Sequence, residues 1–252
     1  MPEIAPPGGA VNWPSDEGAI GVVGVAPWAT LDFCRALYAE IRAAKDWHFP
    51  RVLLDINSKI PSRGRHLQLG ETDPSPAIAA TIRELAAQGA NVAVVVCNTA
   101  HIVYDRWAPG SPIPVPHIVR EAVAQAANQG SRRVTPLVSS SLAEYDLYGL
   151  AVEQAHLECR RLDSEQQRVV GDLIEQIKVQ GALDPTHQDD ARRLLSSLRQ
   201  EGVDTVLAGC TELSSVAQLC TALGLKVVDS NVALARAALA HIRLPSDRRR
   251  SG

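Results

Sequence analysis

The fold is indicated by the stretch Asn91-Val92-Ala93-Val94-Val95-Val96-Cys97-Asn98-Thr99-Ala100-His101, which returns 113 residues later as Asp204-Thr205-Val206-Leu207-Ala208-Gly209-Cys210-Thr211-Glu212-Leu213. Each copy follows a helix-like run that ends in a glycine, Gly89 or Gly202, and each delivers a cysteine eight residues after that glycine. A short apolar run after a glycine helix stop is typical of a buried strand in a parallel sheet. The sequence therefore predicts an internal duplication that puts Cys97 and Cys210 at equivalent positions.

Both cysteines come at the carboxyl end of a predicted strand. In open α/β sheets this edge is where ligands bind, and the next helix begins there with unpaired N–H groups and the positive end of its dipole. A thiol in such a position is expected to have a lowered pKa, which favours the thiolate. The pattern thus predicts two reactive thiols at a ligand-binding edge.

The rest of the chain alternates short apolar runs with helical stretches. This alternation predicts an α/β protein with two similar flavodoxin-like lobes, each a central parallel sheet flanked by helices, related by pseudo-twofold symmetry. Residues 113–116 and 226–228 are expected to be equivalent extended pieces, and residues 57–65 a polar, basic loop at the ligand-binding edge. The expected division of the chain is a disordered leader at 1–17, a first lobe at 18–117 plus 229–252, and a second lobe at 118–228.

Composition excludes several classes of protein. The chain of 252 residues is 46% hydrophobic, which is ample for buried cores, and its net charge of −3 gives no reason to expect a nucleic-acid partner. No apolar run approaches membrane-spanning length and the start lacks a signal-peptide pattern, so we expect a cytoplasmic protein without a membrane partner. The five cysteines form an odd set without a C-x-x-C pair, which suits neither a disulfide scaffold nor a zinc knuckle. For the oligomeric state, a homodimer is the prior expectation.

Two thiols facing one cleft suit a particular chemistry. Inverting a carbon that bears a hydrogen requires that one proton leave one face while another arrives at the opposite face. Two acid/base groups on opposite sides achieve this, and cysteine suits the role because its ordinary pKa of about 8.5 can be drawn toward neutrality. The duplicated motif therefore favours proton transfer at a stereocentre by Cys97 and Cys210.

At this level of detail the chain resembles the cofactor-independent aspartate/glutamate racemases. The resemblance extends from about Ile20 to about Ala240 and rests on the duplication and on three motifs: Cys97-Asn98-Thr99-Ala100-His101, Gly209-Cys210-Thr211-Glu212-Leu213 and Ile60-Pro61-Ser62-Arg63. Glu212 places the chain nearer the aspartate branch, since the glutamate branch usually has a histidine there. The resemblance implies a racemase that interconverts D- and L-acidic amino acids, with aspartate as the expected substrate and without a cofactor or metal.

The resemblance also implies roles for individual residues. Cys97 and Cys210 would be the two bases, the first serving the D-enantiomer and the second the L-enantiomer. The α-carboxylate would be held by side chains beside the cysteines, together with neighbouring main-chain N–H groups: Asn98, Thr99 and Thr211. Arg63 and Lys178, the latter in an Ile-Lys-x-x-Gly pattern, would grip the side-chain carboxylate, which needs paired cations if it is buried.

Three positions depart from the family pattern. The usual Gly-Gly-Met-Gly-Pro turn is replaced by Gly24-Val25-Ala26-Pro27, a usual substrate-contacting Gly-Thr pair aligns with Ser139-Ser140, and Ser62 replaces a common Asp. The catalytic groups are retained while parts of the pocket wall have changed. The reaction type is therefore better determined than the substrate, and a modified or bulkier acidic amino acid stays open.

Alternative interpretations also stay open. His101 is either a partner that tunes a base or a polar helix residue, and Glu212 either tunes Cys210 or favours a helix start. Arg63 could be solvated surface, and Lys178 could serve a helix dipole. The same scaffold could support hydantoin racemisation, malonate decarboxylation or maleate isomerisation. A non-catalytic two-lobed carboxylate-binding protein is the rival from a different class.

Overall fold

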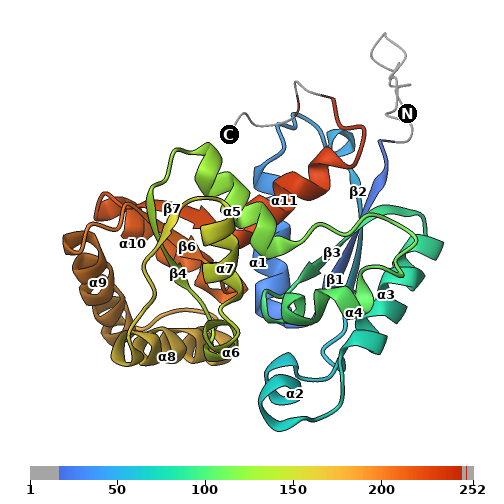
Figure 1. Cartoon of the computed structure of the whole chain (residues 1–252). Helices are drawn as coiled ribbons and strands as arrows, with labels where there is room; N and C mark the ends of the chain where they lie inside the picture. The colour runs from blue at the N-terminus through green and yellow to red at the C-terminus, as the bar shows by residue number, and fades with distance from the viewer. Residues whose placement is uncertain (1–16, 246–247, 249–252) are drawn as a thin grey trace, which may run out of the picture.

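Two parallel β-sheets form the framework of the chain in the computed structural model, which describes residues 17–245 and 248 (Figure 1). The first sheet has the strand order β2 (Arg51–Ile56), β1 (Ala19–Gly24), β3 (Ala90–Val96). The second has the order β5 (Glu158–Cys159), β4 (Arg133–Leu137), β6 (Thr205–Ala208), β7 (Lys226–Asp229). Each described strand pair is parallel, so the chain is an α/β protein, as its alternating pattern predicts.

The second sheet repeats the strand order of the first. Strands β2, β1 and β3 correspond to β5, β4 and β6. The strands that lead to the cysteine motifs occupy equivalent places, because β3 pairs with β1 on the side opposite β2, and β6 pairs with β4 on the side opposite β5. This repetition is what a duplication with a period of 113 residues requires. The predicted fold class of two similar lobes with parallel sheets is confirmed.

One predicted extended piece does not become a strand. Residues 113–116 are expected to be the counterpart of β7, but the structure gives them no strand. Every second position there is a proline, at 112, 114 and 116, and proline lacks the N–H group that a ladder needs. The segment still lies beside β3, because the N–H of Ala93 donates to the carbonyl oxygen of Pro114 at 2.9 Å.

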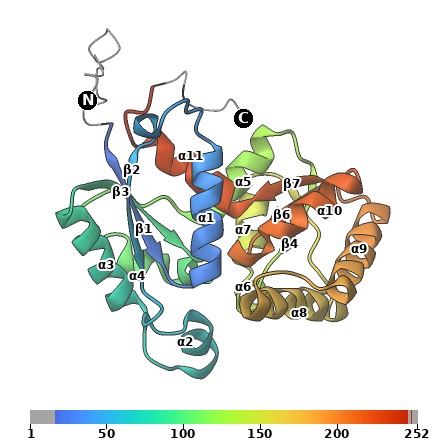
Figure 2. The same cartoon turned by 180° about the vertical axis from the view of Figure 1, so that it is seen from behind.

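Helices fill the space between the sheets and cover their outer faces (Figures 1 and 2). Those between the sheets are α1 (Pro27–Ala39), α5 (Ile118–Asn128), α7 (Leu147–Gln154) and α11 (Ser230–Ala240). Those on the outer faces are α3 (Ser75–Ala87) and α4 (Tyr104–Trp107) on the first sheet, and α8 (Ser164–Gln180), α9 (Pro185–Gln200) and α10 (Ala217–Ala222) on the second. The shorter elements are α2 (Arg63–Leu69), α6 (Ser140–Glu144) and the 3₁₀ helices η1 (Asp46–His48), η2 (Thr99–Val103) and η3 (Thr211–Val216).

An apolar core joins the two lobes. It contains buried side chains from both sheets, such as Val94 and Leu207, and from the helices between them, such as Phe33, Ile118 and Leu234. Helix α11 packs in this core against α1 and α5, so it contacts both halves of the chain. The predicted boundaries at 117/118 and 228/229 stay predictions, and the predicted leader, apart from its last residue, lies outside the described residues.

The polar loop predicted at 57–65 ends earlier than expected. Helix α2 begins at Arg63, because the Ser62 side chain accepts a hydrogen bond from the N–H of Arg65 and caps the first turn. The helix ends at Gly70, which adopts the left-handed conformation with φ of 66°. The start of this short helix, which the charge pattern did not reveal, fixes the position of Arg63.

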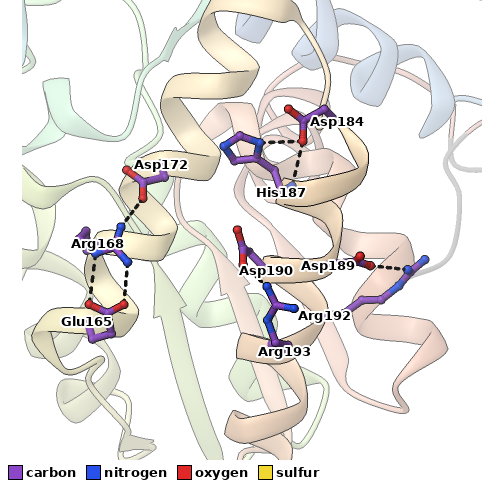
Figure 3. Close-up of polar contacts among 9 residues, drawn as sticks. All are labelled: Glu165, Arg168, Asp172, Asp184, His187, Asp189, Asp190, Arg192 and Arg193. Carbon is purple, nitrogen blue, oxygen red and sulfur yellow. Dashed lines mark hydrogen bonds and ion pairs between the residues drawn. The ribbon is translucent and has the colours of Figure 1, made fainter.

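The outer surfaces of α8 and α9 carry a series of charged pairs (Figure 3). Arg168 pairs with Glu165 and Asp172 on α8, and Arg192 pairs with Asp189 on α9. These groups are exposed, so each pair contributes at most about 1 kcal/mol to stability. Even the longest helices of the described chain are thus amphipathic surface helices, and none of those described has the length and apolar composition to cross a membrane.

Gly209 is required by close packing, and its replacement gives a testable prediction. A Cβ atom at this position would lie 2.7 Å from both Tyr148 and Val138. Gly209→Ala is therefore expected to lower the free energy of unfolding by about 1–3 kcal/mol, measured by urea denaturation. The control is Gly171→Ala in α8, where a Cβ meets no atom within 4 Å, so stability should rise by about 0.5–1 kcal/mol. Equal effects of the two substitutions would contradict the packing argument.

Candidate active site

A pocket of about 160 Å³ lies between the lobes at the carboxyl ends of the strands. Its lining from the first half is Val25, Ala26, Ser62, Arg63, Gly64, Val96, Cys97, Asn98 and Thr99. Its lining from the second half is Ser139, Ser141, Lys178, Cys210, Thr211 and Glu212. The pocket thus brings together all of the candidate site residues except His101. A larger hollow of about 520 Å³, at the other end of the first sheet, contains none of them.

The two thiols reach the pocket from equivalent strand ends. Cys97 directly follows β3 and is half-buried, whereas Cys210 comes just after β6 and is 7% exposed. In each turn the carbonyl oxygen of the cysteine accepts a hydrogen bond from the N–H three residues on, at 3.2 Å from Ala100 and at 2.9 Å from Leu213. The duplicated sequence therefore builds the same turn twice, and the two turns bring both thiols to one pocket.

Cys210 is held as a thiol by its surroundings. Its Sγ donates a hydrogen bond to Oε2 of Glu212 at 2.9 Å, and Oγ1 of Thr211 donates to the same oxygen at 3.1 Å. Burial raises the pKa of the Cys210 thiol well above its ordinary value, the negative charge of Glu212 raises it further, and the ammonium of Lys178 partly offsets both. The expected lowering of this pKa is wrong, because desolvation and a neighbouring carboxylate outweigh the dipole of a short 3₁₀ turn.

Removing the charge of Glu212 should change the acidity of Cys210. Glu212→Gln keeps the shape of the side chain but removes the anion that disfavours a thiolate, so the pKa of Cys210 is expected to fall. The absorbance of the Cys210 thiolate is followed as a function of pH, as the difference between the Glu212→Gln protein and the Glu212→Gln/Cys210→Ser protein. The difference between the wild-type protein and Cys210→Ser gives the reference pKa. A pKa of Cys210 that stays the same or rises would show that Glu212 does not control this thiol.

His101 lies behind the pocket. Its Nδ1 donates a hydrogen bond to the carbonyl oxygen of Cys97 at 2.9 Å, and its ring centroid lies 4.9 Å from His117, 5.2 Å from Trp107 and 5.7 Å from Tyr104. Burial lowers the pKa of His101 to about 3, and the neighbouring His117 lowers it as well. The imidazole is therefore neutral near pH 7, and its contacts suit support of the Cys97 turn.

Arg63 and Lys178 bring two cations to the pocket. Nη1 of Arg63 donates to the carbonyl oxygens of Ile60 and Pro61, at 3.3 and 3.1 Å, and its buried Nε has no hydrogen-bond partner. Both cations line the pocket, and neither forms an ion pair with a carboxylate in the described part of the chain. The pocket, which also contains the carboxylate of Glu212, therefore offers two cations without an ion-pair partner to an anionic ligand.

Hydroxyl groups form another part of the wall. Oγ of Ser139, from the second half, lies 3.2 Å from Oγ1 of Thr99, from the first half, so a hydrogen bond joins the lobes beside the cysteines. Of the pair Ser139-Ser140, only Ser139 lines the pocket, whereas Ser140 begins α6 and Ser141 contributes instead. The position at which the chain departs from the family pattern thus still supplies hydroxyl groups to the site.

Sequence reasoning missed three buried residues that hold the pocket turns: Tyr148, Ser230 and Asn231. Tyr148 Oη donates to Oδ1 of Asn98 at 2.8 Å, and Nδ2 of Asn98 donates to Oγ of Ser230 at 3.0 Å. Nδ2 of Asn231 donates to the carbonyl oxygen of Thr211 at 3.1 Å. A polar run directly after the apolar residues of β7 was the available signal for the last two, whereas nothing in the sequence marks Tyr148.

The fold and the pocket together define a two-lobed α/β protein with a pair of cysteines at a shared site. A model of the Asp/Glu/Hydantoin racemase family matches residues 20–238. The chain belongs to this family. It is accordingly an enzyme, an isomerase of the racemase type, and the resemblance seen in the sequence motifs is confirmed.

Known proteins agree with this family assignment. The broad specificity amino-acid racemase RacX of Bacillus subtilis (strain 168) is 24% identical over 213 residues, which cover 82% of this chain and 86% of that protein. The aspartate racemase of Picrophilus torridus has a similar structure, with a TM-score of 0.80 and 23% identity over 91% of this chain and 97% of that one. An aspartate racemase homologue from Pyrococcus horikoshii OT3 has a TM-score of 0.72 and 19% identity over 88% and 98%. The two solved structures show that the fold is shared over nearly the whole chain.

Proposed function

We propose that this protein interconverts the D- and L-enantiomers of a small acidic amino acid, with aspartate as the favoured substrate. Cys97 and Cys210 would act from opposite faces, one as thiolate base and the other as thiol acid, without a cofactor. The observation that carries this proposal is that both duplicated cysteines line one pocket. Its volume of about 160 Å³ suits a small molecule rather than a large one.

The hydrogen bond and the raised pKa of Cys210 support a direction for the first step. Cys210 donates a hydrogen bond to Glu212 and has a raised pKa, so it is the acid of the unliganded form. Cys97 would then remove the α-proton of the bound enantiomer while Cys210 protonates the opposite face. After one turnover the two thiols have exchanged protonation states, and the same steps run in reverse for the other enantiomer.

The charged groups that line the pocket support an amino dicarboxylate as the substrate. Arg63 and Lys178 supply two positive charges and Glu212 one negative charge. An amino dicarboxylate carries two carboxylates and one ammonium, which complement these groups in number and sign. Thr99, Thr211 and the main chain beside the cysteines would hold the α-carboxylate. Asn98, named for the same role from the sequence, lines the pocket, but its amide is already hydrogen-bonded to Tyr148 and Ser230. Arg63 and Lys178 would bind the second carboxylate.

Hydrogen exchange in heavy water tests the proposal. The purified protein is incubated with L-aspartate or D-aspartate, and the α-hydrogen signal is followed by NMR while chiral chromatography follows the enantiomers. We expect loss of the signal together with formation of the opposite enantiomer. L-Glutamate and hydantoin-5-acetate, a cyclic relative of aspartate with one carboxylate, are the comparison substrates. Faster exchange of the hydantoin would contradict the amino-acid proposal, and binding of aspartate without exchange would contradict racemisation of this substrate.

A further inference from the structure

Helix α11 starts with two consecutive polar residues that are completely buried. Ser230 and Asn231 each have 0% of their surface exposed, and they lie where β7 ends and α11 begins. The start of the helix is itself fixed, because the Asp229 side chain accepts a hydrogen bond from the N–H of Asn231 at 2.7 Å. Buried polar side chains require hydrogen-bond partners, so the identity of these partners shows what the pair holds.

The partners are the two turns that carry the thiols. Ser230 accepts a hydrogen bond from Asn98, the residue directly after Cys97, at 3.0 Å. Asn231 donates a hydrogen bond to the carbonyl oxygen of Thr211, the residue directly after Cys210, at 3.1 Å. Two adjacent residues of one helix thus hold both turns, although the turns belong to different halves of the chain.

A further hydrogen bond ties the Cys97 turn to the second lobe. Tyr148 of α7 is 1% exposed and donates its hydroxyl hydrogen to Oδ1 of Asn98 at 2.8 Å. The amide of Asn98 is therefore held at both ends, by Tyr148 and by Ser230. Since α7 and α11 both pack in the core between the sheets, the turn is held by elements with little freedom to move.

We propose that Ser230 and Asn231 are positioning residues that set the placement of the two thiols on either side of the substrate. Ser230 acts on Cys97 through Asn98, and Asn231 acts on Cys210 through Thr211. This inference rests on the proposed function, because two opposed bases work only when both lie at the correct distance from one stereocentre. A displacement of about 1 Å can cost about 100-fold in rate, so such a reaction needs a fixed frame.

Substitution of Ser230 should slow proton removal by Cys97, and substitution of Asn231 should slow proton removal by Cys210. A substrate with a leaving group at Cβ measures each thiol separately, because its elimination requires proton removal by one thiolate only. With threo-3-chloroaspartate, one thiolate takes the α-proton, the C–H electron pair forms the Cα=Cβ bond, and chloride leaves with the C–Cl pair. The resulting enamine takes up water to give oxaloacetate and ammonium. The L and D forms present the α-hydrogen to opposite faces, so the Cys97→Ala and Cys210→Ala proteins show which enantiomer reports which cysteine.

We expect Ser230→Ala to slow chloride release by about tenfold or more for the enantiomer that needs Cys97, and by less than about twofold for the other. Asn231→Ala should give the opposite preference. Ser230→Thr, which keeps the hydroxyl group, should restore the lost rate. Equal slowing of both enantiomers in each variant, or no slowing at all, would overturn the inference, because a general loss of packing would not distinguish the thiols.

A control and two reserve variants keep the test independent of folding. Ser131→Ala removes another buried hydroxyl, one that accepts from Thr205 at 2.8 Å at the opposite end of β6, and it should leave chloride release unchanged. If Ser230→Ala or Asn231→Ala does not fold, Tyr148→Phe and Asn231→Ser take their places, with the same expected preferences. A wild-type protein that neither releases chloride nor exchanges the α-hydrogen would overturn the proposed function itself, and this inference with it.

Discussion

Replacing either Cys97 or Cys210 by alanine is expected to reduce racemisation of the acidic amino acid by about 10²- to 10⁴-fold or more, since each removes an acid/base group from one face of the substrate. Both thiols line one pocket, and in the proposed mechanism each serves one face of the substrate. Initial rates of formation of the opposite enantiomer, measured from both the L- and the D-form, test this expectation. Substrate binding should persist in both variants, because the groups proposed to bind carboxylates are retained.

The matched control is Cys220→Ala. Cys220 belongs to α10, is completely buried in the apolar core of the second lobe, and is not among the residues that line the pocket. Its substitution should cost some stability through the cavity that it leaves, but racemisation by the folded protein should stay nearly unchanged. If all three alanine variants lost activity to the same extent, a structural effect would explain the losses better than catalysis by two thiols.

Arg63→Met is expected to give the second-largest effect, a fall in kcat/KM of roughly 30- to 3,000-fold with aspartate. Removing one partner of a buried pair of charges costs about 2–5 kcal/mol, and each 1.4 kcal/mol corresponds to about tenfold. Arg63 lines the pocket without a carboxylate partner in the described chain, so the substrate would supply that partner. Steady-state kinetics with aspartate and with alanine should show that the loss is specific to the substrate with a side-chain carboxylate.

Arg65→Met controls for the loss of a positive charge from the same short helix. Arg65 points its guanidinium at Glu71, with which it forms an exposed ion pair outside the pocket. Its substitution should change kcat/KM by less than about threefold, because exposed pairs are worth about 1 kcal/mol or less. Comparable losses in Arg63→Met and Arg65→Met would indicate that the basic charge of α2, rather than a specific contact of Arg63, supports activity.

The fold was predictable because the duplication repeats a pattern with strong physical meaning. Two apolar runs that each follow a glycine and precede a cysteine can hardly form anything other than equivalent buried strands, and the structure confirms this. The predicted secondary structure was wrong at two places, the extended piece at 113–116 and the loop at 57–65, where individual residues favour another structure. Prolines at 112, 114 and 116 remove the N–H groups of the piece equivalent to β7, and the serine cap at Ser62 starts a helix within a predicted loop.

The candidate site was predictable to the extent that its residues lie in motifs. Seven residues named for catalysis or binding do line one pocket, whereas His101 lies behind it and contacts the Cys97 main chain. The raised pKa of Cys210 could not be predicted from spacing, since it depends on burial and on the rotamer that brings Glu212 to the thiol. Ser230, Asn231 and Tyr148 were missed because their roles come from contacts over long distances in the sequence.

The origin of the α-hydrogen in the product tests most directly whether two opposed thiols carry out the reaction. One enantiomer with protium at Cα is incubated in heavy water, and after the first few per cent of conversion both enantiomers are separated and analysed by mass spectrometry. Two opposed thiols should give a product that carries deuterium at Cα, while the recovered substrate keeps protium. Deuterium appearing equally in substrate and product from the earliest time, or a product that retains the original protium, would contradict this mechanism.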